Sequence, residues 1–237
     1  MRTRIRWAAG GFLLGAAAGA AAMHLWMSRP GGVVERFHRL YTARPAQTFN
    51  NTCWLGIPAQ KTPLDMWVFQ ELIHRLQPDV IVETGTYKGG SSYFYASLCD
   101  LIGKGRVVTI DIEDYPGKPR HGRITFLHGS STAPETLRKV RSLIRPGEKV
   151  MVFLDSAHSE RHVREELLLY SPLVTPGSYL IVEDTHFNGH PILPKHGPGP
   201  WEAVDSFLRS HPGFTADRGQ EKFLLTFNPR GFLKRER

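Results

Sequence analysis

The sequence predicts a doubly wound α/β fold built on a mostly parallel sheet. Along most of the chain, short apolar runs that end in a polar residue alternate with amphipathic stretches of helical spacing. The runs are continuously apolar, which is typical of parallel strands covered by helices on both faces. The five runs occupy residues 79–83, 106–112, 124–129, 149–155 and 178–184.

Helix-like segments precede and separate these predicted strands. Residues 64–76 have helical spacing and end before Gln77-Pro78, a helix stop signal. Further amphipathic segments occupy residues 91–102, 132–144, 162–170 and 201–211. The alternation of strands and helices supports the doubly wound α/β fold.

The end of the chain departs from this alternation. Two apolar runs, 222–227 and 231–235, flank the turn signal Asn228-Pro229-Arg230. They predict a C-terminal antiparallel hairpin, which makes the sheet mixed.

The N-terminus has a different character. Three arginines precede an uncharged run from Trp7 to Met27, about long enough to span a bilayer. We expect a transmembrane anchor within residues 1–30; a cleaved signal peptide, with small residues near Ala20 for the peptidase, is the alternative. Residues 31–63 are then a linker and lead-in segment, and residues 64–237 form the catalytic domain. Basic residues flank the run on both sides, so charge does not fix its orientation.

Charge and cysteine content exclude other classes of protein. The formal net charge of +8 comes from the ends: residues 1–50 hold seven Arg and one Glu, and residues 230–237 hold four basic residues and one Glu. Residues 51–229 therefore hold 19 basic and 20 acidic residues, so no nucleic-acid partner is predicted. Two cysteines are too few for a disulfide framework or a zinc knuckle.

Acidic residues collect at the ends of the predicted strands. The five runs end in Glu83, Asp111, Gly129-Ser130, Asp155 and Glu183-Asp184. The carboxyl ends of strands in an open α/β sheet form its ligand-binding edge. A helix cap would explain any one acid, but like charges gathered at one edge repel unless a cation or ligand offsets them. The pattern therefore predicts a binding site.

The first two strand ends suggest a nucleoside-containing cofactor. Glu83 is followed by Gly85 and then by Gly89-Gly90 at the start of a helix, a turn whose amides can approach a ligand closely. Asp111 is placed to bind a ribose diol. The loop is not GxGxxG, and Glu83 would repel a pyrophosphate, so S-adenosylmethionine (SAM) is favoured over a nicotinamide dinucleotide. Whether Glu83 contacts the ligand or orients the glycine turn is open at this point.

The last two strand ends suggest a metal. Asp155, Glu183 and Asp184 offer hard oxygen ligands, which suit Mg²⁺ or a similar divalent cation. His158 lies three residues after Asp155 and is a candidate general base beside the metal. Its alternative role is a structural hydrogen bond at the start of a helix.

Together, the motifs PDVIVETGTYKGGSS, VVTIDIE, LDSAHS and LIVEDT resemble the cephalosporin hydroxylase and rhamnosyl O-methyltransferase family, a branch of the class I SAM-dependent methyltransferases. The resemblance extends from about Trp54 to Arg235. It implies a seven-stranded Rossmann-like sheet, a divalent ion on Asp155, Glu183 and Asp184, and His158 as the base. The predicted cofactor-binding residues are Glu83, Gly85, Thr86, Gly89, Ser91, Asp111, Gly129 and Ser130.

The predicted activity is a metal-assisted methyl transfer from SAM to a hydroxyl of a sugar, glycolipid or secondary metabolite, with His158 and Asp155 as the catalytic residues. The predicted partners are a small-molecule or lipid-linked substrate and the membrane, with a homo-oligomer left open. Because SAM is intracellular, the anchor predicts a membrane location with a cytoplasmic catalytic domain.

Two other functions are compatible with parts of the sequence. An iron-dependent oxygenase could use His158 and Glu160 with a further histidine as a facial triad, but it predicts a jelly-roll barrel. A catalytically silent SAM-binding module would keep the fold without turnover. The Pro- and Gly-rich loop 186–200 follows the predicted metal acids and is expected to form a substrate lid.

Overall fold

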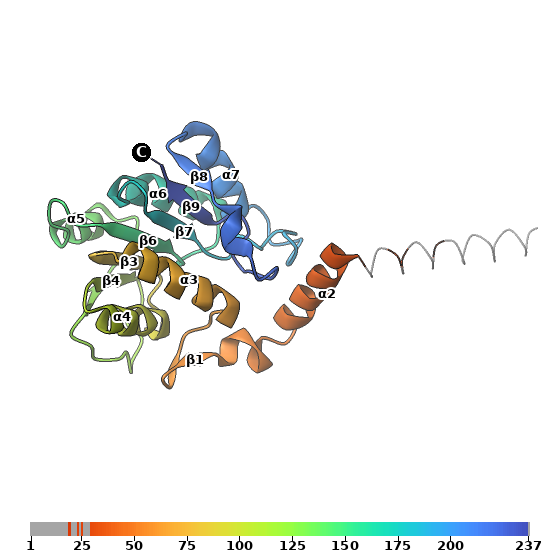
Figure 1. The fold of residues 1–237 in the computed structure, drawn as a ribbon, viewed down its shortest axis with the longest axis horizontal. Coiled ribbons are helices and arrows are strands. Elements are labelled where there is room, and N and C mark those ends of the chain that lie inside the picture. The colour runs from red at the N-terminus through yellow and green to blue at the C-terminus, as the bar shows by residue number, and fades with distance from the viewer. Residues whose placement is uncertain (1–18, 20–22, 24, 26–28, 237) are drawn as a thin grey trace, which may run out of the picture. The chain divides into compact units, whose positions relative to one another are not determined.

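The computed structural model describes residues 19, 23, 25 and 29–236. The chain divides into two compact units, residues 1–40 and Tyr41–Arg237. Helix α2 (Pro30–Thr42) lies mostly in the first unit, and all the strands lie in the second (Figure 1).

The second unit is built on a seven-stranded sheet of order β5-β4-β3-β6-β7-β9-β8. Strands β3 to β7 are parallel, and β9 runs antiparallel to both of its neighbours. The strands are β3 (Val80–Thr84), β4 (Arg106–Asp111), β5 (Ile124–His128), β6 (Val150–Leu154), β7 (Tyr179–Val182), β8 (Phe214–Ala216) and β9 (Phe232–Arg235). The predicted mixed seven-stranded sheet is therefore present, and it is not the barrel that an oxygenase of the jelly-roll type requires.

The strand order reverses next to β3. From β3 the chain moves outward through β4 and β5, then returns to place β6 on the other side of β3. In open α/β sheets such a switch point opens a crevice at the carboxyl ends of the two central strands. The ends of β3 and β6 therefore mark where a ligand site is expected.

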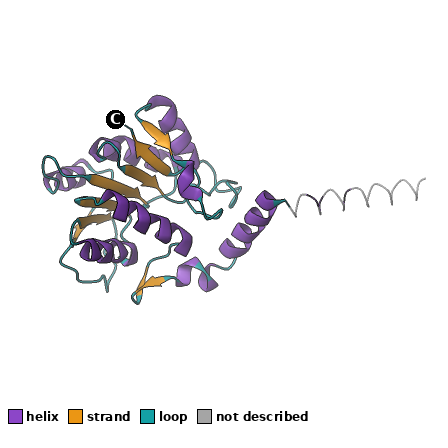
Figure 2. Ribbon diagram, in the orientation of Figure 1, coloured by secondary structure: helices purple, strands orange, loops and turns teal. Residues whose placement is uncertain are grey.

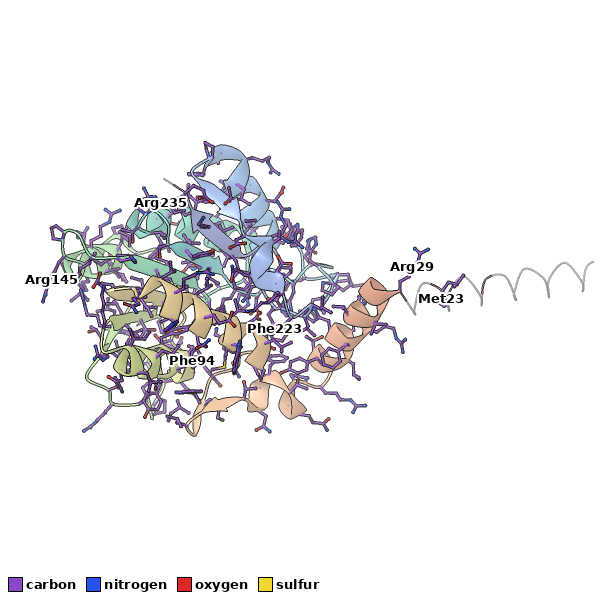
Figure 3. The ribbon with its side chains drawn as sticks, viewed as in Figure 1. Met23, Arg29, Phe94, Arg145, Phe223 and Arg235 are labelled. Carbon is purple, nitrogen blue, oxygen red and sulfur yellow. The ribbon has the colours of Figure 1, made fainter. Side chains whose placement is uncertain are left out.

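Helices cover both faces of the sheet (Figure 2). Alternate strand residues face opposite sides, so Ile81 packs with α3 and α4, whereas Val80 and Val82 pack with α5, α6 and α7. Phe94 of α4, labelled in Figure 3, belongs to the first of these two clusters. The helices are α3 (Pro63–Leu76), α4 (Gly90–Ile102), α5 (Pro134–Ser142), α6 (Glu160–Tyr170) and α7 (Pro200–Ser210).

Short elements complete the unit. The segment before α3 holds a two-stranded antiparallel ribbon, and a Cβ on Gly90, at the start of α4, would overlap the carbonyl of Pro58 in that ribbon. The ribbon thus packs directly on the glycine turn that follows β3. The short elements are β1 (Cys53–Trp54), β2 (Ile57–Pro58) and the 3₁₀ turns η1 (Pro45–Gln47), η2 (Phe49–Asn51), η3 (Ser171–Leu173) and η4 (Arg218–Glu221).

The composition of the C-terminal hairpin differs from the prediction. The strand that pairs with β9 is β8 (Phe214–Ala216), and residues 222–227 form an irregular segment of turn and bends instead of a strand. The reason is a tertiary contact, because Thr226 and Phe227 donate hydrogen bonds from a side chain and a backbone N–H to the buried carboxylate of Asp65. Burial raises the pKa of Asp65 to about 7, although these two hydrogen bonds act to lower it.

The predicted membrane anchor is corrected by the structure. Within the part of the chain that the structure describes, no helix is both long and apolar enough to cross a membrane. Helix α2, the first helix described at length, has 13 residues and carries Glu35, Arg36 and Arg39, whereas a span needs about 20 apolar residues. Most of the run from Trp7 to Met27 lies outside the described residues. The anchor is not supported, nor is the membrane location that depended on it.

One ion pair joins the sheet to the loop before β6. Arg106 donates from both terminal nitrogens to Glu148, at 2.8 and 2.7 Å, and the backbone N–H of Arg145, labelled in Figure 3, also donates to Glu148. The hydrogen bond with Arg106 is the main cause that lowers the pKa of Glu148 to about 2. A lowered folded-state pKa means that the carboxylate stabilises the fold above its unfolded value and loses this effect as the pH falls.

We therefore expect Glu148→Gln to lower the free energy of unfolding by about 2 kcal/mol at pH 7. The difference between the two proteins should shrink as the pH falls from about 4.5 toward 2. Urea titrations at several pH values measure both effects. Glu236→Gln, in an exposed pair with Lys234, is the control and should change stability much less. Equal losses in the two variants would contradict the interpretation.

Candidate active site

A cavity of about 510 Å³ lies at the carboxyl ends of β3, β4 and β6, where the strand order reverses. Its walls combine the turns after β3 and β4 with the segments after β5 and β6. The lining residues are Gly85, Tyr87, Ile110, Asp111, Ile112, Glu113, Tyr115, Ser130, Ser131, Asp155, Ser156, Ala157 and His162. Three of the predicted cofactor residues, Gly85, Asp111 and Ser130, are among them.

The glycine turn brings β3 and β6 close together. Gly85 has a positive φ of 88°, and a Cβ there would overlap the backbone oxygen of Asp155. Gly89 caps α4 with a φ of 83°, and a Cβ would lie 2.8 Å from the ring of Pro119. Glycine is thus required at both positions by conformation and by close approach.

Glu83 lies behind this turn and does not line the cavity. Its side chain is fully buried and accepts hydrogen bonds from the hydroxyls of Ser91, Ser92 and Thr109. Burial raises the pKa of Glu83, and Lys61 with the three hydroxyls acts in the opposite direction. The carboxylate ties the first turn of α4 to β3 and β4. Of the two roles left open by the sequence, orienting the turn is the one that this geometry favours.

Glu83→Gln should test this role. The amide keeps the shape but offers one acceptor oxygen to three hydroxyls, so we expect the unfolding free energy to fall by about 2 kcal/mol. SAM affinity should fall with it by about tenfold, because the turn loosens. Denaturant titration and calorimetry measure the two quantities. A loss of affinity with unchanged stability would instead indicate direct contact with the ligand.

Asp111 lines the cavity at the end of β4. One carboxylate oxygen accepts from the N–H of Tyr87 at 2.7 Å, and the other accepts from the N–H of Glu113 at 2.9 Å. The rings of Tyr87 and Tyr115 pack edge to face nearby, at 4.9 Å between centroids. Asp111 thus organises a polar wall with two aromatic rings at one end of the cavity.

The other predicted cofactor residues lie next to the cavity but do not line it. Thr86 is buried and its hydroxyl bonds that of Thr109 at 2.6 Å. Gly129 has a φ of 146°, and a Cβ there would lie 2.7 Å from the hydroxyl of Thr136. Ser91 bonds Glu83. The structure therefore brings all eight residues to one region, and Glu83, Thr86, Gly89, Ser91 and Gly129 lie outside the cavity lining.

A second cluster adjoins the cavity. Ligand atoms of Asp155, His158 and Asp184 all lie within 4.8 Å of one another. His158 Nε2 is 3.2 Å from Asp184 Oδ2 and 3.6 Å from Asp155 Oδ1, and His186 Nε2 is 3.2 Å from Asp184 Oδ1. Burial alone would lower the pKa of His158, but Asp184 and Asp155 raise it to about 9. The two carboxylates therefore favour the protonated imidazolium, whose charge offsets theirs.

The turn after β7 holds Asp184 in an unusual conformation. Its φ of 55° is in the left-handed region, and its N–H donates to Asn228 Oδ1 at 3.0 Å. Thr185 donates from its hydroxyl to the carbonyl of Pro229 at 2.7 Å. The C-terminal segment therefore fixes the direction of this carboxylate. Burial acts to raise the pKa of Asp184, but His158 and His186 lower it overall.

Glu183 stands apart from the cluster of three and is linked to it through Lys61. The ammonium of Lys61 pairs with Asp155 Oδ2 and lies 2.8 Å from Glu183 Oε2. Burial raises the pKa of Glu183 well above its usual value, with Lys61 acting against it. Glu183 Oε1 is buried and has no hydrogen-bond partner among the described residues. An orphaned carboxylate oxygen beside two further acids is a donor set that fits a hard divalent cation.

Comparison with known proteins identifies the family of this chain. The family model described as Rhamnosyl O-methyltransferase/CmcI matches residues 46–236. The rhamnosyl O-methyltransferase of Mycobacterium leprae is 39% identical over 211 residues, which cover 86% of this chain and 91% of that protein. The rhamnosyl O-methyltransferase of Mycobacterium bovis is 37% identical over 222 residues, covering 90% and 89%. The chain belongs to the Rhamnosyl O-methyltransferase/CmcI family. The family inferred from the motifs is confirmed, as is the enzyme class of O-methyltransferase.

Solved structures of CmcI have the same fold. A CmcI structure with Mg and SAM has a TM-score of 0.60 and 21% identity, covering 79% of this chain and 77% of that chain. A CmcI apo structure has a TM-score of 0.61 and 22% identity, covering 81% and 83%. The likeness confirms the class I methyltransferase fold of this family member.

Sequence reasoning missed several residues of the site. Lys61 lies in a loop-like stretch 94 residues before Asp155, and no local motif points to it. His162 lines the cavity and lies 3.2 Å from the Ser131 hydroxyl and 3.0 Å from that of Ser156. Behind it, the fully buried Glu166 accepts from the Ser156 hydroxyl at 2.7 Å. The helical spacing of His162 and Glu166 was the only available signal, and it is shared with ordinary helix pairs.

The loop predicted to be a lid is braced against α7. Asn188 donates to Glu202 at 2.9 Å, and the ring of His190 stacks on Trp201 at 4.1 Å between centroids. The ring of Phe187 packs edge to face on His158, at 5.1 Å. The loop thus contacts the acid cluster at one end and helix α7 at the other. As a substrate lid it stays a prediction.

Proposed function

We propose that this protein is a SAM-dependent O-methyltransferase that is assisted by a divalent cation such as Mg²⁺ and acts on a hydroxyl of a sugar. The observation that carries the proposal is the double position of Asp155, which lines the cavity and also belongs to the acid cluster. A methyl donor in the cavity and an acceptor at the cluster would therefore be neighbours.

The cavity suits the cofactor. Its volume of about 510 Å³ is in the range of small-molecule sites. Asp111 supplies a carboxylate for a ribose diol, and the turn at Gly85 allows close approach of a ligand. The carboxylates of Asp111, Glu113 and Asp155 favour a ligand that carries a positive charge, such as a sulfonium with an amino group.

The acid cluster suits the metal. Asp155, Glu183 and Asp184 are the proposed ligands: Asp155 and Asp184 belong to the group of ligand atoms within 4.8 Å of one another, and Glu183 adds the orphaned Oε1. When bound, SAM supplies the methyl group, and the cation supplies a Lewis acid that lowers the pKa of the acceptor hydroxyl. His158 accepts the proton of that hydroxyl at Nε2, the atom that faces both aspartates. Because the pKa of His158 is raised to about 9, the imidazole must lose a proton before it can act as the base.

The acceptor is proposed from the relatives and from a second cavity. Both mycobacterial relatives are rhamnosyl O-methyltransferases, and they align with most of this chain. Beside the loop braced on α7, a cavity of about 340 Å³ is lined by His190, Trp201 and the carboxylates Glu160, Glu202 and Asp205. Aromatic rings with carboxylates suit the binding of sugar hydroxyls, so a deoxysugar on a small or lipid-linked carrier is the first class to test.

The test is a transfer assay with SAM carrying a labelled methyl group. Purified protein is incubated with rhamnosyl glycosides, other sugars and phenols, in Mg²⁺ and in EDTA. We expect label on a sugar hydroxyl in Mg²⁺ and loss of transfer in EDTA. Absence of SAM binding by calorimetry, together with no transfer to any hydroxyl in Mg²⁺, would overturn the proposal.

A further inference from the structure

Lys61 is buried among the three proposed metal ligands, Asp155, Glu183 and Asp184, which we call the acid cluster. Its side chain is 6% exposed, and its ammonium contacts carboxylates that follow two neighbouring strands, Asp155 after β6 and Glu183 after β7. An ammonium in such a place could be a mere structural counter-ion. The arrangement of the individual oxygens indicates a more specific role.

Two of the three acids are each bound by Lys61 through one carboxylate oxygen. Lys61 holds Asp155 Oδ2 and Glu183 Oε2. The opposite oxygens differ in surroundings: Asp155 Oδ1 faces His158 at 3.6 Å, and Glu183 Oε1 is buried without a partner among the described residues. Asp184 differs, because both of its oxygens face histidines, Oδ1 toward His186 and Oδ2 toward His158.

We propose that Lys61 is a positioning residue of the metal site, which grips one oxygen of Asp155 and one of Glu183 so that their second oxygens are set for a divalent cation. This inference rests on the proposed function. Groups that bond metal ligands from behind fix ligand orientation, and their loss typically weakens metal binding 10- to 100-fold. Here a single ammonium serves two ligands from different strands.

The backbone of Lys61 is fixed as firmly as its side chain. Its N–H donates to the hydroxyl of Thr52 at 3.1 Å, and that hydroxyl shares its one hydrogen between the carbonyls of Phe49, at 2.7 Å, and Lys61, at 3.0 Å. The preceding ribbon packs on Gly90 at the start of α4. The segment before α3 therefore delivers one rigidly placed cation to the acids and braces the glycine turn of the cofactor cavity.

The experiment is calorimetry of Mg²⁺ and of SAM with the full chain and the variant Lys61→Gln. The amide has a similar length and can donate to one carboxylate, but it carries no charge. We expect the Kd for Mg²⁺ to rise about 10- to 100-fold and the Kd for SAM to stay within about twofold. The rise in melting temperature on adding Mg²⁺ should shrink in parallel. Lys222→Gln, which removes a surface pair with Glu71, is the matched control and should leave both Kd values unchanged.

The outcomes separate the inference from the function. Unchanged or tighter Mg²⁺ binding by Lys61→Gln would overturn the positioning role, as would an equal loss of SAM affinity, which indicates general misfolding. If wild-type protein shows neither heat nor a melting shift with Mg²⁺, the proposed metal site itself fails. If Lys61→Gln does not fold, Lys61→Arg is the deciding variant. Arginine keeps the charge but replaces the single ammonium nitrogen with a planar guanidinium, so the Kd for Mg²⁺ should rise by about threefold or more. Unchanged affinity in that variant contradicts the inference.

Discussion

Asp184→Asn should lower the turnover number for methyl transfer by about 10³-fold or more while leaving SAM affinity within about twofold. The side chain keeps its shape, and asparagine tolerates the left-handed backbone at this position better than most residues, so the fold should survive. What is lost is one negative charge of the cluster that faces His158 and His186. A 10³-fold loss corresponds to about 4 kcal/mol of transition-state stabilisation, within the range expected for loss of metal assistance.

Three measurements check this expectation. Turnover comes from the labelled-methyl assay, and the affinities for SAM and for Mg²⁺ come from calorimetry. Asp184 does not line the cofactor cavity, so only the Mg²⁺ affinity should fall with turnover. Asp100→Asn, at a surface pair with Arg123, is the matched control and should behave as wild type. Full activity of Asp184→Asn would remove Asp184 from the site.

Most of the fold could be predicted because its signals are local. Continuous apolar runs between amphipathic segments identified five parallel strands, and the structure places each within two residues of its predicted bounds. The hairpin prediction was wrong in one strand for a non-local reason. Residues 222–227 have an apolar pattern, but hydrogen bonds to Asp65, about 160 residues earlier, hold them in an irregular segment.

The candidate site also has features that the sequence predicts and features that depend on tertiary packing. Acids at strand ends share one edge by topology alone, so Glu83, Asp111, Asp155 and Asp184 could be placed near each other from the sequence. Topology does not say which carboxylate faces the ligand. Three hydroxyls turn Glu83 inward, and only three-dimensional packing brings them together. The role of Lys61 could not be predicted for the same reason, because no sequence motif near it indicates that it contacts Asp155 and Glu183.

His158 has two candidate roles, general base and metal ligand, and the variant His158→Gln distinguishes them. His158→Gln keeps a polar side chain between the two aspartates but cannot accept a proton at neutral pH. If His158 is the base, we expect turnover to fall about 10²- to 10⁴-fold with little change in the affinities for SAM and Mg²⁺. If it is a ligand, the affinity for Mg²⁺ must fall as well, because its Nε2 belongs to the group of atoms within 4.8 Å.

The geometry favours the base. Asp184 and Asp155 raise the pKa of His158 to about 9, which favours its protonated form. A divalent cation on those carboxylates would oppose that proton by charge repulsion, which leaves a neutral imidazole beside the acceptor hydroxyl. Proton release on Mg²⁺ binding therefore gives a direct readout: wild-type protein should release more protons than His158→Gln, as measured by calorimetry in buffers of different ionisation enthalpy. His121→Gln, at a surface pair with Asp100, is the control. Equal proton release by the wild type and His158→Gln, with equal turnover, would assign the proton transfer to another group.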